Sequence, residues 1–287
     1  MQPLQQFPQG QRSIGAILID AGKISALDAE KILREQKQSK LRFGDAALKL
    51  GLLNPDDIQF ALARQFDYPY LARGDQSISE EVIAAFNPFS PIVEQLRALR
   101  TQLMLRWFDV DVSHKSLAVV SPANCEGRSF VAANLAVVFS QLGERTLLID
   151  ADLRNPKQHL LFKIDDSTGL SAVLSGRTMA GEALSKVATL LGLSVLPAGA
   201  TPPNPQELLS RDAFSTMLSA YSDAFDVIII DTSAATVSAD AQTISARAGA
   251  ALLVARLNQT PVAALHSLAT NLQDSNVTVV GSLLNGI

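Results

Sequence analysis

Apolar residues follow two different patterns along the chain, and these patterns divide it into a front part and a larger back part. From Ser116 onward, short continuous apolar runs alternate with longer segments of helical spacing. Such runs are typical of parallel strands that are buried on both faces and connected by helices. The pattern predicts an α/β fold whose mostly parallel sheet is covered by helices on both faces. Its strands are expected at residues 116–120, 146–149, 193–196, 227–230, 250–255 and 277–284.

The front part contains an internal repeat, because residues 13–36 and 42–65 can be laid over each other without a gap. In each copy, a helix start precedes apolar residues at helical spacing. Each helix start has a capping residue and an aspartate three positions later, Ser25 and Asp28 in the first copy and Asn54 and Asp57 in the second. In the second copy, Pro55 takes the first helical position. We expect two small helical units that pack together as one domain over residues 1–75.

A segment rich in turn-forming residues follows the repeat, and we expect a linker at residues 76–91. An amphipathic helix is predicted next, over residues 92–105, as the first element of a back domain that extends to residue 287. Its charged residues Glu94, Arg97 and Arg100 are spaced three apart, which places them close to one stripe of the helix. Without further information, this stripe is interpreted as a solvated charged face.

The first predicted strand leads into a segment that resembles a phosphate-binding loop. A strand, a tight loop and a helix in this order place backbone N–H groups and a positive helix end around a phosphate. The usual pattern ends in Gly-Lys followed by Ser or Thr, whereas this chain has Gly127-Arg128-Ser129. The residues expected at the nucleotide are Ala123, Asn124, Cys125, Glu126, Gly127, Arg128, Ser129 and Phe130.

Acidic residues follow two of the later predicted strands, with Asp150 and Asp152 after one and Asp231 after the other. Because α/β sheets carry their sites at the carboxyl ends of the strands, we expect these carboxylates to lie near the phosphate loop. Carboxylates hold Mg²⁺ directly or through water, and the hydroxyl group of Ser129 is a further ligand. The sequence therefore predicts binding of ATP and Mg²⁺, with Ser129, Asp150 and Asp231 at the metal.

Composition narrows the class of protein. The net charge of −4 over 287 residues gives no general nucleic-acid signature, so no nucleic-acid partner is expected. A single cysteine excludes a disulfide framework and favours a reducing compartment. Neither a signal peptide nor an apolar run long enough to span a bilayer is expected.

Three further segments of the back part are informative: the acidic segment from Ile149 to Pro156, Leu196-Pro197-Ala198-Gly199 followed by the Pro-Pro-Asn-Pro segment at 202–205, and Gly281 to Asn285. In these segments, residues 92–287 resemble the cytoplasmic bacterial tyrosine kinases that control exopolysaccharide chain length. The resemblance implies an ATP-dependent transferase that moves the γ-phosphoryl group to tyrosine. Relative to this family, Cys125 replaces a glycine and Phe130 replaces a small hydroxyl residue.

The same resemblance implies roles for individual residues. The loop would offer amides to the β-phosphate, and Arg128 would contact the β- and γ-phosphates. Ser129 and Asp231 would position Mg²⁺. Asp150 would orient or deprotonate the attacking hydroxyl, with Asp152 beside it on metal or substrate. The catalytic set is therefore Arg128, Asp150, Asp152 and Asp231, and Asn285 would lie near adenine.

Partners and location are also implied by the resemblance. It implies an integral membrane chain-length regulator as partner and a ring of identical chains joined through Glu94, Arg97 and Arg100. The protein would then be cytoplasmic and peripheral to the inner membrane through its partner. The family's C-terminal tyrosine cluster is not found here, where the tyrosines are Tyr68, Tyr70 and Tyr221. We therefore expect the tyrosine substrate to lie elsewhere, for example on a partner.

The front repeat resembles the N-terminal domain of type II secretion and pilus-assembly ATPases, which in a tandem form is a cyclic-di-GMP receptor. The matching positions expected at that ligand are Gly15, Gln36, Arg42, Gly44 and Gln65. The alternative is that the glycines only end helices and the leucines only fill a core. Together with the back part, the architecture resembles the EpsG-type chain-length determinant kinases.

Two other functions stay open from the sequence. A nucleotide-binding pseudokinase or scaffold with a cyclic-di-GMP-sensing front domain is favoured by Arg128 in place of lysine and by the absent tyrosine cluster. A partitioning or positioning ATPase would share the sheet, but it carries an additional lysine early in the loop, and none stands near Ala123.

Overall fold

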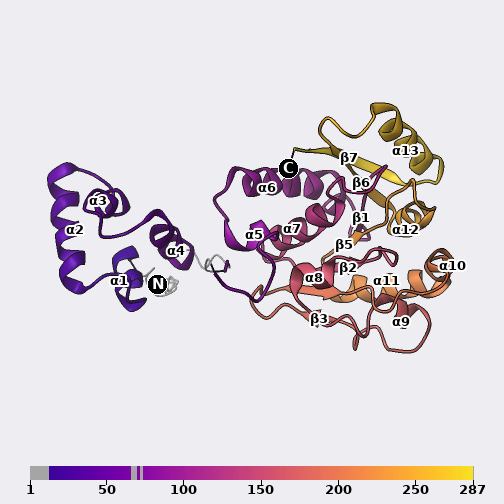
Figure 1. Ribbon diagram of the computed structural model, residues 1–287, viewed down its shortest axis with the longest axis horizontal. Helices are drawn as coiled ribbons and strands as arrows, with labels where there is room; N and C mark the ends of the chain where they lie inside the picture. The colour runs from indigo at the N-terminus through magenta and orange to yellow at the C-terminus, as the bar shows by residue number, and fades with distance from the viewer. Residues whose placement is uncertain (1–12, 66–69, 72–73, 287) are drawn as a thin grey trace, which may run out of the picture. The chain divides into compact units, whose positions relative to one another are not determined.

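The computed structural model describes residues 13–65, 70–71 and 74–286. It divides into two compact units, Met1–Ala72 and Arg73–Ile287. The first unit is helical, and the second is built on a sheet (Figure 1). Tyr68 lies outside the described residues. No helix in the described part of the chain is long and apolar enough to cross a membrane.

Within its described residues, the first unit contains four helices with bounds α1 Ile14–Asp20, α2 Ala26–Ser39, α3 Phe43–Lys49 and α4 Pro55–Gln65. Both predicted helix starts are confirmed. The Ser25 hydroxyl accepts from Asp28 N, and the Asp28 carboxylate accepts from Ser25 N. Asn54 and Asp57 make the same reciprocal pair of bonds. Each pair satisfies N–H groups that a helix start leaves without intrahelical partners.

The repeat is also visible in the backbone of this unit. Gly22 follows α1 with a φ of 67°, and its counterpart Gly51 follows α3 with a φ of 65°. A left-handed residue after a helix is the conformation for which glycine is favoured. Leu18 and Ile32 are fully buried in the small core that the four helices enclose.

The second unit contains a seven-stranded sheet within its described residues, in the order β3-β4-β2-β5-β1-β6-β7. The short edge strand β3 is antiparallel to β4, and the other neighbours are parallel. The strands are β1 Ser116–Val120, β2 Thr146–Asp150, β3 Ser185–Lys186, β4 Leu193–Leu196, β5 Val227–Asp231, β6 Ala250–Arg256 and β7 Thr278–Asn285. The six strands predicted from the sequence are confirmed, and β3 was missed because two residues carry no periodic pattern.

Helices cover both faces of this sheet. Their bounds are α5 Ile83–Phe86, α6 Pro91–Leu103, α7 Arg128–Ser140, α8 Gln158–Phe162, α9 Leu170–Leu174, α10 Pro205–Ser210, α11 Asp212–Ala224, α12 Asp240–Ala248 and α13 Val262–Asp274. Alternate strand residues such as Ala118, Ile149 and Ile230 pack with α11 and α12 in one core cluster. Helix α7 lies against β1, β2 and β5 and is buried along nearly its whole length.

The segment expected as a linker, residues 76–91, differs from that expectation because part of it is built into the second unit. Ile78 and Val82 are buried, and the short helix α5 packs on α7. The side chain of Asn134 on α7 fastens this segment: its Oδ1 accepts from Ala84 N at 2.9 Å, and its Nδ2 donates to Glu81 O at 3.1 Å. Turn-forming residues predicted an irregular path but could not show that it is held by a buried asparagine.

Helix α6 carries the three charges of the predicted stripe and continues into a π-helix, η1 Met104–Phe108. Glu94 and Arg97 form an ion pair of 3.0 Å within the helix. Arg100 instead donates to Val138 O of α7 at 2.6 Å. The stripe is therefore divided, since Arg100 fastens α6 to α7 while Glu94 is exposed.

Candidate active site

The candidate active site begins at the loop between β1 and α7. Cys125 has a φ of 61° and Gly127 a φ of 96°, both in the left-handed region, and α7 starts directly afterwards. Glycine adopts this conformation freely, whereas a residue with a side chain pays about 1 kcal/mol or more. The two left-handed residues turn the backbone sharply, so the positive N-terminal end of α7 lies at the loop.

Glu126 holds this loop closed. Its buried carboxylate accepts from Ala123 N at 2.7 Å through Oε2, and the Thr260 hydroxyl bonds to Oε1. The Ala123 amide was expected at the β-phosphate, but in the structure it is used within the loop. The difference arises because the glutamate side chain folds back and satisfies an N–H group that would otherwise need a ligand.

Gly127 lies tightly against the end of β7. A Cβ atom at this position would lie 2.1 Å from Asn285 Nδ2, which itself donates to Glu126 O at 3.1 Å. Asn285, expected near adenine, is therefore a direct neighbour of the phosphate loop in the structure. The approach explains why the position requires glycine both for space and for its positive φ.

Arg128 is turned into the protein, with only 6% of the residue exposed. Its Nε donates to Thr232 O at 2.9 Å, and its Nη1 donates to Ser121 Oγ at 2.5 Å and to Ala123 O at 2.7 Å. Asp152 Oδ2 lies 3.9 Å from Nη2. The sequence predicted a phosphate contact for Arg128. In the structure, its guanidinium group instead connects the loop to the residues that directly follow β1 and β5.

Two acids predicted for the site are brought together by strand register, since Asp150 of β2 pairs with Asp231 of β5. Asp150 Oδ2 accepts from the backbone N–H groups of Lys157 and Gln158 at 2.9 and 2.8 Å. Asp231 Oδ2 accepts from Gln158 Nε2 at 2.7 Å. Asp231 Oδ1 is buried and has no hydrogen-bond partner among the described residues.

Burial shifts the titration of both acids. It raises the pKa of Asp150 well above the ordinary range, and the neighbouring Asp231 carboxylate raises it further. Burial also raises the pKa of Asp231 to about 6, against the opposing hydrogen bond from Gln158. Two buried carboxylates side by side are typical of a site that is completed by a cation or a proton.

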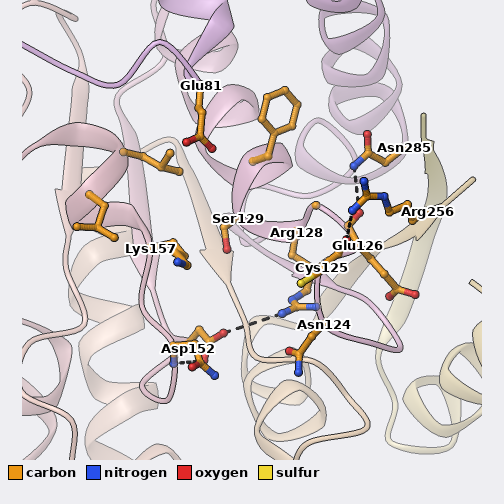
Figure 2. Close-up of a pocket in the computed structure, with 15 residues that line it drawn as sticks. Glu81, Asn124, Cys125, Glu126, Arg128, Ser129, Asp152, Lys157, Arg256 and Asn285 are labelled. Atoms are coloured by element: carbon orange, nitrogen blue, oxygen red, sulfur yellow. Dashed lines mark hydrogen bonds and ion pairs between the residues drawn. The ribbon is translucent and has the colours of Figure 1, made fainter. Parts of the chain in front are cut away.

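A cavity of about 670 Å³ opens above these residues and is lined by 15 residues (Figure 2). Of the predicted site residues, Asn124 to Phe130, Asp152 and Asn285 line it. Ala123, Asp150 and Asp231 do not line it and belong to the layer beneath. Six lining residues were missed by sequence reasoning: Glu81, Asn155, Lys157, Leu160, Leu161 and Arg256. Only Asn155 and Lys157 carried a signal, since they follow the Asp150–Asp152 segment.

Magnesium fits this arrangement only together with a ligand. Among the described residues, no group of three or more His, Cys, Asp or Glu side chains is placed to hold a metal ion alone. The unpartnered Asp231 Oδ1 and the nearby Ser129 hydroxyl nevertheless supply two hard oxygen atoms, the kind of donor that Mg²⁺ prefers. The remaining ligands would come from phosphate oxygens and water.

A second cavity, of about 490 Å³, lies in the first unit. Gly15 and Gln36 of the first repeat line it together with Phe43 and Gln65 of the second. Arg42 is exposed and does not line it, and Gly44 faces Ile58 instead. Of the five residues predicted for cyclic-di-GMP, the structure thus brings Gly15, Gln36 and Gln65 together.

Known proteins resemble the chain over most of its length, although no family model matches it. The putative tyrosine-protein kinase in the cps region of Klebsiella pneumoniae is 34% identical over 218 residues, which are 76% of this chain and 30% of that protein. The chain therefore spans less than a third of the length of this relative. Tyrosine-protein kinase YwqD of Bacillus subtilis is 35% identical over 209 residues, which are 73% of this chain and 87% of that protein.

Solved structures agree with the sequence relatives. The kinase domain of Escherichia coli tyrosine kinase ETK is 31% identical with a TM-score of 0.70, over 77% of this chain and 86% of that one. The septum site-determining protein MinD complexed with Mg-ADP, from Pyrococcus horikoshii, is 22% identical with a TM-score of 0.53, over 60% of this chain and 70% of that one. At this identity the likeness to MinD concerns the fold alone. The predicted α/β fold is confirmed.

Proposed function

The chain belongs to the bacterial tyrosine-protein kinases, and on that premise we propose that it transfers the γ-phosphoryl group of ATP to a tyrosine hydroxyl. The observation that carries this proposal is the cavity at the carboxyl ends of β1, β2 and β5, which the phosphate loop and Asp152 line and beneath which Asp150 and Asp231 are buried. A loop of this kind and strand-end carboxylates are the parts that phosphoryl transfer requires.

Different parts of the site have different roles in the proposed reaction. The N-terminal end of α7 supplies N–H groups and positive potential to the phosphates. Ser129 and Asp231 Oδ1 would hold Mg²⁺, which when bound neutralises charge on the phosphate oxygens. Gln158 and the braced loop fix these groups before the substrate arrives, so that little reorganisation accompanies the transfer.

Asp152 is the acid that we assign to the acceptor hydroxyl, because it lines the cavity while Asp150 is fully buried beneath it. In the reaction, the tyrosine oxygen forms a bond to the γ-phosphorus, and the bond from that phosphorus to the β–γ bridging oxygen breaks. The phenolic proton passes to the carboxylate, and ADP leaves. Asp150 positions this side of the site through the backbone of Lys157 and Gln158.

The test is phosphotyrosine formation by the purified full chain with Mg·ATP and a membrane partner or a tyrosine-containing polypeptide. We expect phosphotyrosine with the wild type, with rates lowered at least a hundredfold by Asp152→Asn and strongly by Asp150→Asn. Complete absence of transfer by the wild type to both acceptors would refute the kinase proposal.

The cellular setting belongs to the same proposal. The relative from Klebsiella pneumoniae is named for the cps region, which supports a role in control of exopolysaccharide chain length. We propose a cytoplasmic chain that reaches the inner membrane through an integral membrane regulator, with an EpsG-type arrangement of the two units. Ring formation would use Glu94 and Arg97, with Arg100 as the fastening of α6 to α7. Static light scattering of Glu94→Ala against the wild type tests the ring.

A second candidate function is favoured by one observation, the engagement of Arg128 with the loop's own oxygen atoms. A site whose arginine does not contact phosphate would bind nucleotide without efficient transfer, as in a pseudokinase or scaffold. Nucleotide binding without phosphotyrosine formation would favour this function over the kinase.

The cavity of the first unit supports a sensing role. It is lined from both repeats by Gly15, Gln36 and Gln65, and its volume of about 490 Å³ lies in the range of small-molecule sites. We propose cyclic-di-GMP as its ligand. Calorimetric titration of the full chain with cyclic-di-GMP tests this proposal, and the variants Gln36→Ala and Arg42→Ala, the latter at an exposed position, are compared with the wild type. If the wild type gives no heat of binding, cyclic-di-GMP is rejected as the ligand.

A further inference from the structure

Three cationic side chains line the cavity of the second unit: Arg128, Lys157 and Arg256. Two of them are bonded to the phosphate loop itself. Arg128 donates to Ala123 O at 2.7 Å, and Arg256 donates through Nη1 to Cys125 O at 2.8 Å. Both guanidinium groups therefore hold the shape of the loop, and moving either one toward a ligand would break a hydrogen bond to a carbonyl oxygen of the loop.

Lys157 is different in this respect. It is exposed, and within the part of the chain that the structure describes its ammonium group forms no ion pair and no hydrogen bond. Its backbone is nevertheless fixed, because Lys157 N donates to Asp150 Oδ2 at 2.9 Å. In Figure 2, Lys157 and Arg128 lie on opposite sides of Ser129.

The chemistry of a transferring phosphate calls for such a group. Charge accumulates on the terminal phosphate oxygens, and a lysine of the phosphate loop ordinarily neutralises it. Lysine is a compact cation on a flexible stem, whereas the broad guanidinium of Arg128 is already committed to three acceptors. A free ammonium group on the opposite wall can supply the charge that the loop position lacks.

We propose that Lys157, and not Arg128, is the cation that contacts the terminal phosphate of the bound nucleotide. This inference rests on the proposed function, since it assumes a nucleoside triphosphate in the cavity. Arg128 is then a positioning residue that keeps the loop in its binding shape. Lys157 thus compensates for the arginine at position 128, where phosphate-binding loops usually have lysine. It does so from a segment that approaches the phosphates from the other side.

The test compares affinities of the full chain for a non-hydrolysable ATP analogue and for ADP, each with Mg²⁺, by calorimetry. Since Lys157→Gln removes a charged hydrogen bond to the terminal phosphate, it should lower the affinity for the analogue about tenfold or more. Its affinity for ADP, which lacks the terminal phosphate, should change by less than about twofold. Lys157→Arg should retain most of the preference for the analogue.

Two controls make the result specific. Lys186→Gln removes the same charge from the exposed edge strand β3 and should leave both affinities unchanged. Arg128→Lys should lower the affinities for both nucleotides together, because it loosens the loop to which both bind. Equal losses of both nucleotides in Lys157→Gln, or an unchanged preference for the analogue, would overturn the inference alone. Binding of neither nucleotide by the wild type would overturn the proposed function and the inference with it.

Discussion

Gln158 donates its Nε2–H to Asp231 Oδ2 at 2.7 Å and to Ser129 O at 3.1 Å. One amide group thereby joins the acid at the end of β5 to the first turn of α7. Because Oδ2 is occupied, the carboxylate is left with Oδ1 buried and unpartnered within the described residues. The oxygen that remains is the one available to a cation beside Ser129.

Replacing Gln158 by methionine keeps the size of the side chain and removes the donor. The hydrogen bond from Gln158 opposes the burial that raises the pKa of Asp231, so the pKa should rise further above about 6. Mg²⁺ then competes with a proton up to higher pH. We expect the acid limb of the pH profile of Mg²⁺-dependent nucleotide affinity to move to higher pH. An unshifted profile would show that Gln158 does not tune this acid.

Asp231 also links stability to pH. Its pKa is raised from 3.8 to about 6, so the folded state keeps a proton that the unfolded state has lost between these pH values. The contribution of Asp231 to folding stability is therefore fully present below about pH 4, and it is lost as the pH rises through about 6. Asp231→Asn abolishes this loss, and its stability relative to the wild type should improve by up to about 3 kcal/mol from pH 4 to pH 7.

Urea unfolding at both pH values measures this difference. Asp226→Asn is a control of opposite sign, because the ion pair with Arg145 lowers the pKa of Asp226 to about 2. The ion pair between Asp226 and Arg145 stabilises the folded state at pH values above the pKa of Asp226 in the unfolded chain. Asp226→Asn should therefore lower the free energy of unfolding at pH 7. A pH-independent difference between Asp231→Asn and the wild type would contradict the assignment.

Gly127→Ala should abolish nucleotide binding. The added methyl group would lie 2.1 Å from Asn285 Nδ2, and alanine resists the φ of 96°. Asn285→Ala removes the clash but not the backbone strain, so the double variant should recover binding in part. The pair is measured as a double-mutant cycle with a fluorescent ATP analogue. Additive losses would mean that the two residues do not interact.

Asn134→Ala should destabilise the second unit by about 2–3 kcal/mol, because it leaves Ala84 N, Glu81 O and Phe130 O without their buried partner. Hydrogen exchange at the Ala84 amide should become faster. Asn271→Ala makes the same chemical change on the exposed side of α13 and is expected to be neutral. Equal unfolding midpoints for the two variants would show that Asn134 does not fasten the segment.

Most of the fold follows from the sequence for a simple reason. The strands of the sheet are short continuous apolar runs, and parallel strands buried on both faces leave this signal whatever their neighbours are. The caps at Ser25 and Asn54 are equally local, since a helix start is satisfied by residues three positions apart. Such features need no knowledge of the tertiary structure.

The directions of side chains in the site were not predictable in this way. Gly127-Arg128-Ser129 predicted a phosphate contact for the arginine, but its guanidinium found acceptors at Thr232 and Ala123 in other segments of the fold. Glu81 enters the cavity from a segment that looked like a linker, because Asn134 holds that segment on α7. Both outcomes depend on contacts between residues far apart in sequence, which no local pattern encodes.

The most direct measurement of the central claim is a crystal structure of the full chain with Mg²⁺ and a non-hydrolysable ATP analogue. The account predicts the triphosphate at the N-terminal end of α7, with Mg²⁺ beside Ser129 and Asp231 and with Lys157 on the terminal phosphate. A nucleotide bound away from this loop, or a loop that stays closed to phosphate in crystals grown at saturating analogue, would contradict it.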